Sequence, residues 1–551
     1  MAHENYDFSP ESHDSIPRPN RFGLIIHPTV FIGSSIVIFI FIALGVAIPD
    51  TMETIFEATQ AFIAHYFGWF YMIVVTGILG FIIWVACSRY GNIPLGPNDS
   101  KPDYSYFSWF TMLFAAGMGI GLLFYSVAEP LTHFTDPPTG AGRLDGEGAQ
   151  RAFHLTYFHW GVHPWAIYSL FGGTVAYVGF RRGQPLTYRT AFYPLLGERV
   201  HGAYGSVLDI FGTVGTLFGV ATSLGLAAIQ INRGLEYAFG VVIHPYVQFA
   251  LIAIITAMAT TSEYLGLDAG IRRVSIANIS LAGIACVVML IMGPTVFIFN
   301  IFVQNLGYYV QHLIETTTWT ATFEGSEWLA DWTVFYWAWW ISWSPFVGLF
   351  IARISRGRTL REFIVGTILA PTLATFAWMS IFGGSAMFVE MFQAPDAGLA
   401  AEVVEDVDVA MFALLEHFPF HQVTWIVAVV LILGFFVSSS DSGSMVDSII
   451  TAGGHPHPPR PQRIYWCLME GVVAAILLWV GGLTALQTGA ITTGLPLAAL
   501  LVLMAISFHK ALRQERSIRF SPVFQPPEVY EELTGLSDTE SEDEEDDMPR
   551  L

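Results

Sequence analysis

The feature that most constrains the fold of this chain is a succession of long apolar segments between residues 28 and 508. A helix of about 20 apolar residues spans the hydrocarbon core of a bilayer. Hydrophobic residues make up 53% of the chain and charged residues only 13%, which is more apolar surface than a soluble domain has to bury. The sequence therefore predicts an all-α polytopic membrane protein. Twelve segments have this character: 28–49, 69–88, 108–128, 153–179, 205–232, 243–261, 274–301, 332–352, 362–388, 422–446, 464–482 and 486–508.

The positions of Lys and Arg predict how these segments are oriented, because positive charges are enriched in cytoplasmic loops. With a cytoplasmic N-terminus, only Arg143, Arg151 and Arg233 of the 24 Lys and Arg residues fall outside. We therefore expect twelve transmembrane helices in a bacterial cell (inner) membrane, with both termini in the cytoplasm. The expected domains are an N-terminal arm over 1–26, a transmembrane domain over 27–510 and an acidic C-terminal tail over 511–551.

The net charge of −21 comes largely from the tail, where eight of the ten residues from Asp538 to Asp547 are acidic. Such a run is solvated and argues against nucleic-acid binding. Outside the membrane, apolar residues of 302–325 recur with helical spacing and predict an amphipathic helix that lies on the membrane or against a neighbouring subunit.

Residues 114–130 are apolar, yet Gly117, Gly119 and Gly121 occupy every second position. Each Gly lowers helix stability by about 1 kcal/mol relative to Ala. Unwound backbone is tolerated in a membrane only where it lines a protein-enclosed site. By itself this stretch predicts either a broken helix around a binding site or a close contact between helices.

A second interruption is expected five segments later, in residues 336–350. There Pro345 removes a helix hydrogen bond, and Ser342 and Ser344 compete for backbone partners. Interrupted helices at matching places in two halves are typical of inverted-repeat transporters. The pair of breaks favours unwinding in the first stretch, and it predicts that segments three to seven and eight to twelve form two inverted five-helix repeats.

Aromatic residues gather on one side of each of two segments. Indole faces attract cations, and quaternary ammonium groups bind in aromatic cages of this kind. The alternative is an aromatic belt at the membrane interface, but most of these side chains lie well inside their segments. The residues are Trp160, Trp165 and Tyr168 in the fourth segment and Trp339, Trp340 and Trp343 in the eighth.

Oxygen-bearing side chains mark the tenth segment, where Phe435, Ser438 and Ser439 share one helix face. Serine hydroxyls with free carbonyl groups of an unwound helix form a hard-oxygen site suited to Na⁺. The alternative is that the serines bond back to their own helix. Thr216, with Thr222 and Ser223, is a weaker candidate for a second Na⁺.

Few ionisable residues lie within the segments, and each is a functional candidate by default. Glu129 precedes Pro130 at the end of the third segment, which indicates a structural role at a helix end. Asp441 is expected beside the sodium site. Three histidines, His154, His159 and His163, are expected to be hydrogen-bonded core residues, with proton relay as the alternative. The chain shows no catalytic set, phosphate loop or metal-spaced His/Cys cluster, so we expect neither an enzyme nor an organic cofactor.

At these residues the chain resembles the betaine/choline/carnitine transporter family over about residues 25–510. The motifs that carry the resemblance are GMGIGLLFY at 117–125, HWGVHPWAIY at 159–168, WWISWSPFVG at 339–348 and SSSDSG at 438–443. The resemblance implies a LeuT-like fold of twelve helices with two inverted five-helix repeats, a homotrimer in membrane lipid, and uptake of a quaternary ammonium or similar solute.

The resemblance also implies roles for individual residues. Trp160, Trp165, Tyr168, Trp340 and Trp343 would form the aromatic cage, with Trp339 beside it. We expect Gly117, Met118, Gly119 and Gly121 of the broken helix to bind the substrate as well. The main-chain oxygens of Ala115 and Met118, with Phe435, Ser438 and Ser439, would hold Na⁺. Thr216 would match part of a second sodium site, but its expected partner is Val220, which offers no oxygen.

Gly121 bears on the substrate, because choline-carrying relatives tend to have Asp there to balance a net cation. The absence of an acidic side chain at position 121 favours a zwitterionic substrate. We therefore expect a secondary active Na⁺-coupled symporter that imports glycine betaine or a compatible solute such as ectoine for osmoprotection. The alternatives are a proton-coupled or exchange transporter of choline or carnitine, and a solute-binding osmosensor without transport.

Overall fold

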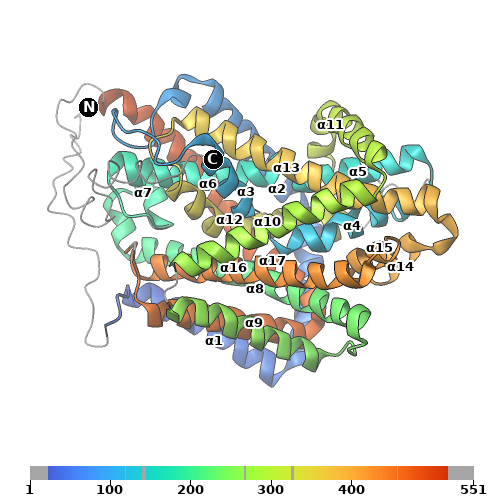
Figure 1. Ribbon diagram of the computed structural model, residues 1–551. Coiled ribbons are helices and arrows are strands. Elements are labelled where there is room, and N and C mark those ends of the chain that lie inside the picture. Colours follow the sequence, from blue (N-terminus) through green and yellow to red (C-terminus); the bar gives the residue numbers. More distant parts are fainter. Residues whose placement is uncertain are drawn as a thin grey trace, which may run out of the picture.

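The computed structural model describes residues 23–117, 119–138, 144–265, 268–323, 328–455 and 457–518. Within these ranges the regular secondary structure is helical, apart from one isolated β-bridge between Pro94 and Thr359, and turns and irregular segments connect the helices. The long helices lie side by side in one bundle (Figure 1). The all-α prediction is confirmed. Most of the N-terminal arm, most of the acidic tail and Met118 lie outside the described residues.

Helices cover all twelve expected segments. They are α1 (Pro28–Ala47), α2 (Pro49–Cys87), the pair α3 (Tyr106–Gly117) and α4 (Ile120–Thr135), the pair α5 (Gly146–Trp160) and α6 (Val162–Ala176), α8 (Ala203–Phe239), α9 (Pro245–Leu265), α10 (Asp268–Met292), α12 (Phe335–Arg353), α13 (Leu360–Phe388), α16 (His421–Thr451) and α17 (Arg460–Ile518). The last helix covers two segments, separated by a kink where Gly481 and Gly482 leave helical geometry.

Further helices connect these elements. They are α7 (Tyr193–Leu196), α11 (Thr295–Thr318), α14 (Leu399–Glu405), α15 (Ala410–Glu416), the 3₁₀ turns Arg89–Asn92, Arg189–Phe192, Gly197–His201, Pro395–Ala397 and Val407–Val409, and the π-helical turns Tyr177–Arg181, Ala330–Val334 and Val389–Gln393.

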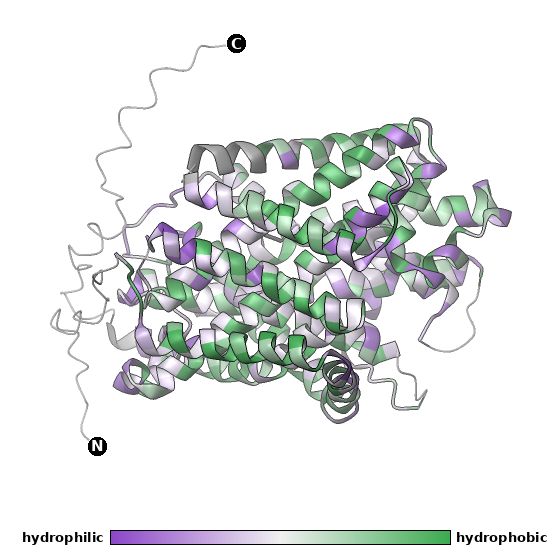
Figure 2. Cartoon of the chain, turned by 90° about the horizontal axis from the view of Figure 1, so that it is seen from below, coloured by the Kyte–Doolittle hydropathy of each residue, from purple (hydrophilic) through white to green (hydrophobic). Residues whose placement is uncertain are grey.

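The surface of the bundle fits a multi-pass membrane protein. Among the described residues, eight helices are long and apolar enough to cross a membrane, or nine if the bent pair of α10 and α11 forms one span. Large hydrophobic side chains such as Ile40, Ile73 and Ile254 are exposed on the outer helices. Hydrophilic residues gather toward the helix ends and connections (Figure 2). The number of twelve crossings and the inverted repeats stay predictions.

The glycine-rich stretch does interrupt a helix. Helix α3 ends at Gly117 and α4 begins at Ile120, while Gly119 between them is extended at φ −118° and ψ −171°. The structure thus decides between the two possibilities left open by this stretch, because close helix packing alone would have left one continuous helix.

The expected second interruption at Pro345 is wrong, because α12 runs without a break from Phe335 to Arg353. A proline leaves the carbonyl group four residues earlier without its helical donor. Here that group belongs to Ile341, and the hydroxyl of Ser344 donates to it across 2.7 Å. The serine therefore compensates for the proline within the helix, where we had expected it to help unwind the backbone.

A break that we did not predict separates α5 from α6 at Gly161, whose φ of −91° and ψ of −137° are not helical. A Cβ atom at this position would lie 2.5 Å from the main-chain oxygen of Tyr157 and 2.6 Å from the hydroxyl of Tyr309. The close approach of α11 therefore requires a glycine directly after Trp160.

The loops rich in Lys and Arg meet at one end of the bundle. The main-chain nitrogen of His27 donates to the oxygen of Thr451 across 2.7 Å, and that of Leu95 donates to the oxygen of Arg358 across 2.8 Å. The connection after α6 links these two contacts, since Arg189 lies 3.4 Å from His27 and Arg181 donates to the main-chain oxygen of Gly96 across 2.7 Å. The start of α1 and the connections after α2, α6, α12 and α16 thus occupy the same end. This agrees with the loop assignment from charge, while the side of the membrane that this end faces stays a prediction.

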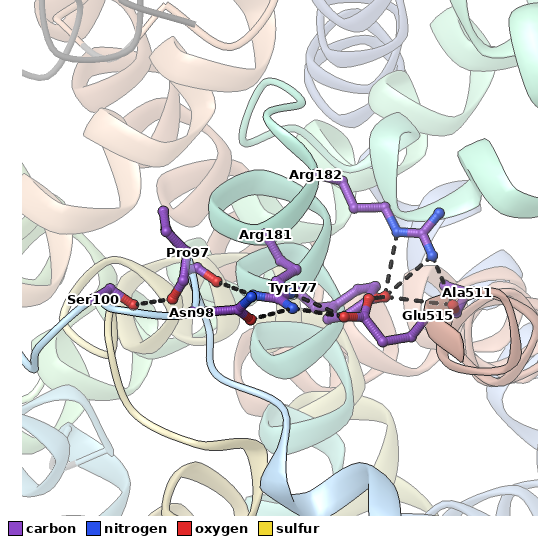
Figure 3. A network of polar contacts seen from close by, with 9 residues as sticks. Pro97, Asn98, Ser100, Tyr177, Arg181, Arg182, Ala511 and Glu515 are labelled. Atoms are coloured by element: carbon purple, nitrogen blue, oxygen red, sulfur yellow. Dashed lines mark hydrogen bonds and ion pairs between the residues drawn. The ribbon is translucent and has the colours of Figure 1, made fainter. Parts of the chain in front are cut away.

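The end of α17 is fixed to the same region by a polar network (Figure 3). The guanidinium group of Arg181 donates to Glu515 Oε1 and to the main-chain oxygen of Gly96, each across 2.7 Å. The hydroxyl of Tyr177 donates to Glu515 Oε2 across 2.7 Å. Helix α17 therefore extends beyond the expected membrane boundary at residue 510 and is held there by buried charge.

The expected amphipathic helix is present as α11, bent by 110° from the preceding helix. Tyr309 is buried, whereas Val303, Val310 and Ile314 are exposed. Only part of its apolar surface therefore packs within this chain, and its contact with lipid or a neighbouring subunit stays a prediction.

Candidate functional site

The break between α3 and α4 is covered by tryptophan rings. A Cβ atom at Gly119 would lie 3.1 Å from Cη2 of Trp343. One at Gly121 would lie 2.7 Å from Cη2 of Trp160 and 2.8 Å from Cη2 of Trp339. Both glycines are therefore needed for these rings to reach the backbone of the broken helix. Gly117 is the last residue of α3.

Trp160, Trp339 and Trp340 form one cluster where the end of α5 meets α12. The ring centroids of Trp339 and Trp340 are 4.9 Å apart and stacked, and Trp160 meets Trp340 edge-on at 4.9 Å. Trp343 meets Trp339 at 6.2 Å. All four side chains are at most 5% exposed. They are therefore not an aromatic belt facing the membrane interface.

Hydrogen bonds fix three of these indoles to different helices. The Nε1 atoms of Trp340 and Trp343 donate to the main-chain oxygens of His159 and Gly219, across 3.0 and 2.9 Å. Trp160 Nε1 donates to a carboxylate oxygen of Glu129 across 2.7 Å. The cluster is therefore preorganised, which lowers the entropy that a ligand must lose on binding.

Trp165 and Tyr168 lie on α6, on the other side of the break at Gly161. Their rings meet edge-on with centroids 5.5 Å apart, and both are buried. Among the described residues the hydroxyl of Tyr168 has no hydrogen-bond partner. It is thus a buried polar group suited to a ligand.

The environment of Glu129 in the structure differs more from our expectation than that of any other residue that we singled out. We expected it at a helix end, but α4 continues through Pro130 to Thr135, and the Glu129 side chain is fully buried. Its Oε1 lies 2.6 Å from Nδ1 of His159 and 3.3 Å from Nε2 of His133. A signal was present in the sequence, since an acid within an apolar segment needs buried partners.

Glu129, His133 and His159 place their ligand atoms within 4.8 Å of one another, a spacing that could hold a metal ion. The second carboxylate oxygen of Glu129 is occupied by donors from Trp160 and Tyr336. We therefore interpret the group as a hydrogen-bond network. His159 is bonded through both ring nitrogens, since it also contacts Thr333. His154 and His163 bond Thr316 and Thr317 through Nε2, but among the described residues their Nδ1 atoms have no partner, so the expectation of hydrogen-bonded histidines is met in full for His159 alone.

The hydroxyls of Ser438 and Ser439 donate to main-chain oxygens one turn earlier, those of Gly434 and Phe435, across 3.1 and 3.0 Å. This is the back-bonded arrangement that we had weighed against ion binding. A hydroxyl that donates its hydrogen keeps two lone pairs, so each serine still offers oxygen to a cation. Ala115 lies within α3 without a described side chain, and Met118 lies outside the described residues.

A cavity of about 630 Å³ opens between α9 and α16 beside Ser438 and includes Ser262 and Asp441. Asp441 Oδ2 accepts from Ser262 across 3.0 Å, and the fully buried Glu470 of α17 accepts from Ser440 across 2.6 Å. Asp441 thus lies in the same cavity as Ser438, and Glu470 contacts the neighbouring Ser440, so two buried carboxyl groups lie close to the serine run of α16.

Thr216 is fully buried in α8, and its hydroxyl has no hydrogen-bond partner among the described residues. Val220, one turn later, packs against α16, where it lies within 2.9 Å of a Cβ atom built at Gly443. Thr222 and Ser223 bond the main-chain oxygens of Phe218 and Gly219. The residue one turn after Thr216 therefore supplies no oxygen ligand to the expected second sodium site.

Comparison with known proteins agrees with these features. The model for the betaine/carnitine/choline family of transporters matches residues 29–517. An uncharacterized transporter of Mycobacterium tuberculosis is 45% identical over 492 residues, 88% of this chain and 82% of the relative. The glycine betaine transporter OpuD of Bacillus subtilis is 42% identical over 475 residues, 86% and 92% of the two chains. A glycine betaine transporter of Acinetobacter baylyi is 40% identical over 519 residues, which cover 93% of this chain and 78% of the relative.

Proposed function

We propose a function from one premise: the chain belongs to the betaine/carnitine/choline family of transporters. It is accordingly a membrane transporter and not an enzyme. Within the family we propose a secondary active Na⁺-coupled symporter that imports glycine betaine, or a related compatible solute such as ectoine, for osmoprotection. The relatives named as glycine betaine transporters support this substrate class.

The observation that carries the proposal is the packing of Trp160, Trp339 and Trp340 around the broken helix at Gly121. A trimethylammonium group has no hydrogen to donate, so hydrogen-bond acceptors cannot recognise it. Indole faces can, at about 0.5–2 kcal/mol for each good contact. Trp343, with Trp165 and Tyr168 from α6, completes the proposed substrate site.

The chemistry around Gly121 favours a zwitterion. An acidic side chain there would place its Cβ atom within 2.8 Å of two indole rings, so the packed cluster has no room for an acid at this position. One observation favours the alternative of a choline or carnitine carrier. The buried carboxylate of Glu129 lies directly behind Trp160, where it would also favour a net cation.

For the coupling ion we propose Na⁺ bound by Ser438 and Ser439 with main-chain oxygens of Ala115, Met118 and Phe435. The serine lone pairs, the nearby helix break and the two buried carboxyl groups close to the serine run support such a site. A second Na⁺ beside Thr216 is less well supported, because Val220 supplies no oxygen.

Uptake of labelled glycine betaine into bacterial cells that lack their own betaine carriers tests this function. We expect uptake that saturates and that falls to background when K⁺ replaces Na⁺. Undiminished uptake without Na⁺ but with a pH dependence would establish the proton-coupled alternative. Competition by betaine, ectoine, proline, choline and carnitine identifies the preferred substrate.

Purified protein in sealed vesicles distinguishes a transporter from an osmosensor that only binds solute, because only a transporter accumulates betaine along an imposed Na⁺ gradient. The same preparation tests the expected homotrimer, whose mass in detergent would be three times the 60.9 kDa of one chain.

A further inference from the structure

We propose that Glu129 is a positioning residue that sets the affinity of the substrate site through the indole of Trp160. The inference rests on the proposed function and names how that site is tuned. A carboxyl group that is fully buried inside a transmembrane helix is costly unless it is fully hydrogen-bonded. Glu129 has no place in the proposed sodium site, so its burial beside the cluster requires another explanation.

The carboxylate of Glu129 accepts hydrogen bonds on both oxygens. Oε2 accepts from Nε1 of Trp160 across 2.7 Å and from the hydroxyl of Tyr336 across 2.5 Å. Oε1 faces Nδ1 of His159 at 2.6 Å and Nε2 of His133 at 3.3 Å. Among the described residues its ion-pair partners are these two histidines, with neither Lys nor Arg among them.

Glu129 also reaches the opposite wall of the cluster. The main-chain oxygen of its partner His159 accepts from Nε1 of Trp340 across 3.0 Å. The ring of Tyr336, its other partner, is stacked with Trp340 at 5.8 Å. One carboxylate therefore holds Trp160 directly and Trp340 through two intermediates, which fixes the interplanar angle of 73° between the two rings.

The contact with Trp160 has an electrostatic consequence. The negative face of an indole attracts a cation through the quadrupole of the ring. A charge-assisted hydrogen bond from the indole N–H to a carboxylate polarises the N–H bond and raises the electron density of the ring, so its faces become more negative, and a low local dielectric strengthens the effect. A neutral acceptor would hold Trp160 in place yet leave its face less negative. The affinity of the site for a cationic group should therefore depend on the charge of Glu129 as well as on the shape of its side chain.

The test uses full-length protein in lipid vesicles, with glycine betaine binding followed by calorimetry and uptake followed by label. Glu129→Gln keeps an acceptor for Trp160 and removes the charge. We expect it to weaken betaine binding about three- to thirtyfold, the range of one cation–π contact. The maximal uptake rate and the Na⁺ concentration for half-maximal uptake should change less than twofold.

Trp160→Phe removes the indole donor and should weaken binding to a similar degree. The double variant should lose less affinity than the product of the two single fold losses, because both substitutions remove the same interaction. Glu129→Asp, which restores the charge one methylene farther away, should recover part of the affinity. The matched control is His154→Asn, a buried polar residue bonded to Thr316 away from the cluster, which should retain wild-type affinity.

Unchanged betaine affinity in Glu129→Gln would overturn the inference while leaving the proposed function intact. A fold loss of affinity in the double variant that equals the product of the two single losses would also overturn the inference, because Glu129 would then act independently of Trp160. If Glu129→Gln fails to fold, Trp160→Phe and Glu129→Asp still test the inference. Unchanged betaine affinity in both variants would show that the hydrogen bond between Glu129 and Trp160 does not set the affinity. Wild-type protein that binds no betaine would overturn the proposed function together with this inference.

Discussion

The indole Nε1 of Trp343 donates to the main-chain oxygen of Gly219 across 2.9 Å, which joins α12 to α8 beside the broken helix. The contact depends on the missing side chain of Gly219, because a Cβ atom there would lie 2.7 Å from Cδ1 of Trp343. The position of one cage residue is therefore set by a helix that contributes no aromatic group to the proposed cage.

Gly219→Ala should displace the Trp343 ring and weaken betaine binding about tenfold while the protein still folds, since Ala is the better helix former. Affinity measured in vesicles checks this. Gly77→Ala is the control, because a Cβ atom at Gly77 meets nothing within 4 Å. Equal affinity in the two variants would show that α8 adapts and that the contact does not hold Trp343.

Trp340→Ala should lower betaine affinity by about 1–2 kcal/mol, roughly five- to thirtyfold, because a desolvated cation–π contact is lost. The dissociation constant measured by calorimetry is the readout. Trp479→Ala is a suitable control, because this tryptophan is 48% exposed on α17. If both variants bind betaine like the wild type, Trp340 has only a packing role.

Gly121→Ala should weaken binding and uptake together, because the added Cβ atom forces apart Trp160 and Trp339, which lie within 2.8 Å of it. Measuring uptake at several betaine concentrations separates lower affinity from lower expression. A variant with normal affinity would mean that the two rings move aside without cost, and that Gly121 is not required by space.

Replacing both serines, Ser438→Ala with Ser439→Ala, should raise the Na⁺ concentration needed for half-maximal uptake several-fold, because two oxygen ligands are removed. Ser438→Thr should keep the wild-type value, since the hydroxyl is retained. The control is Ser442→Ala, which removes another hydroxyl bonded back to the same helix. A change confined to the amount of protein in the membrane would assign the serines a structural role.

Arg181→Ala should lower thermal stability, because it leaves the nearly buried carboxylate of Glu515 without its ionic partner (Figure 3). Breaking a buried ion pair costs about 3–5 kcal/mol, and the partial exposure of Arg181 places the expected loss at the lower end. The melting temperature of purified protein measures it. Recovery of stability in the exchange Arg181→Glu with Glu515→Arg would show that the pair acts through charge, whereas an unaffected Arg181→Ala would exclude this role.

The sequence alone determined the class of the protein, because apolar segments long enough to cross a bilayer permit little besides helices. It offered the break before Ile120 as one of two possibilities, since three alternating glycines destabilise a helix, and it identified the tryptophans that meet there. Predictions from the local sequence failed at two positions where hydrogen-bond partners determined whether the helix continues. Pro345 leaves α12 intact because Ser344 satisfies the freed carbonyl group. The break after Trp160 is accommodated because the hydroxyl of Tyr309 in α11 accepts from the freed main-chain N–H of Val162.

Only the tertiary structure decided the role open to Glu129. In the sequence this acid precedes a proline and looks like a helix end, and nothing near it in the chain shows that His159, Trp160 and Tyr336 surround it. Their convergence depends on how α4, α5 and α12 pack, which periodicity within one helix cannot specify. The physical reason is that a buried charge is stable only with several partners at once, and these come from helices distant in the sequence.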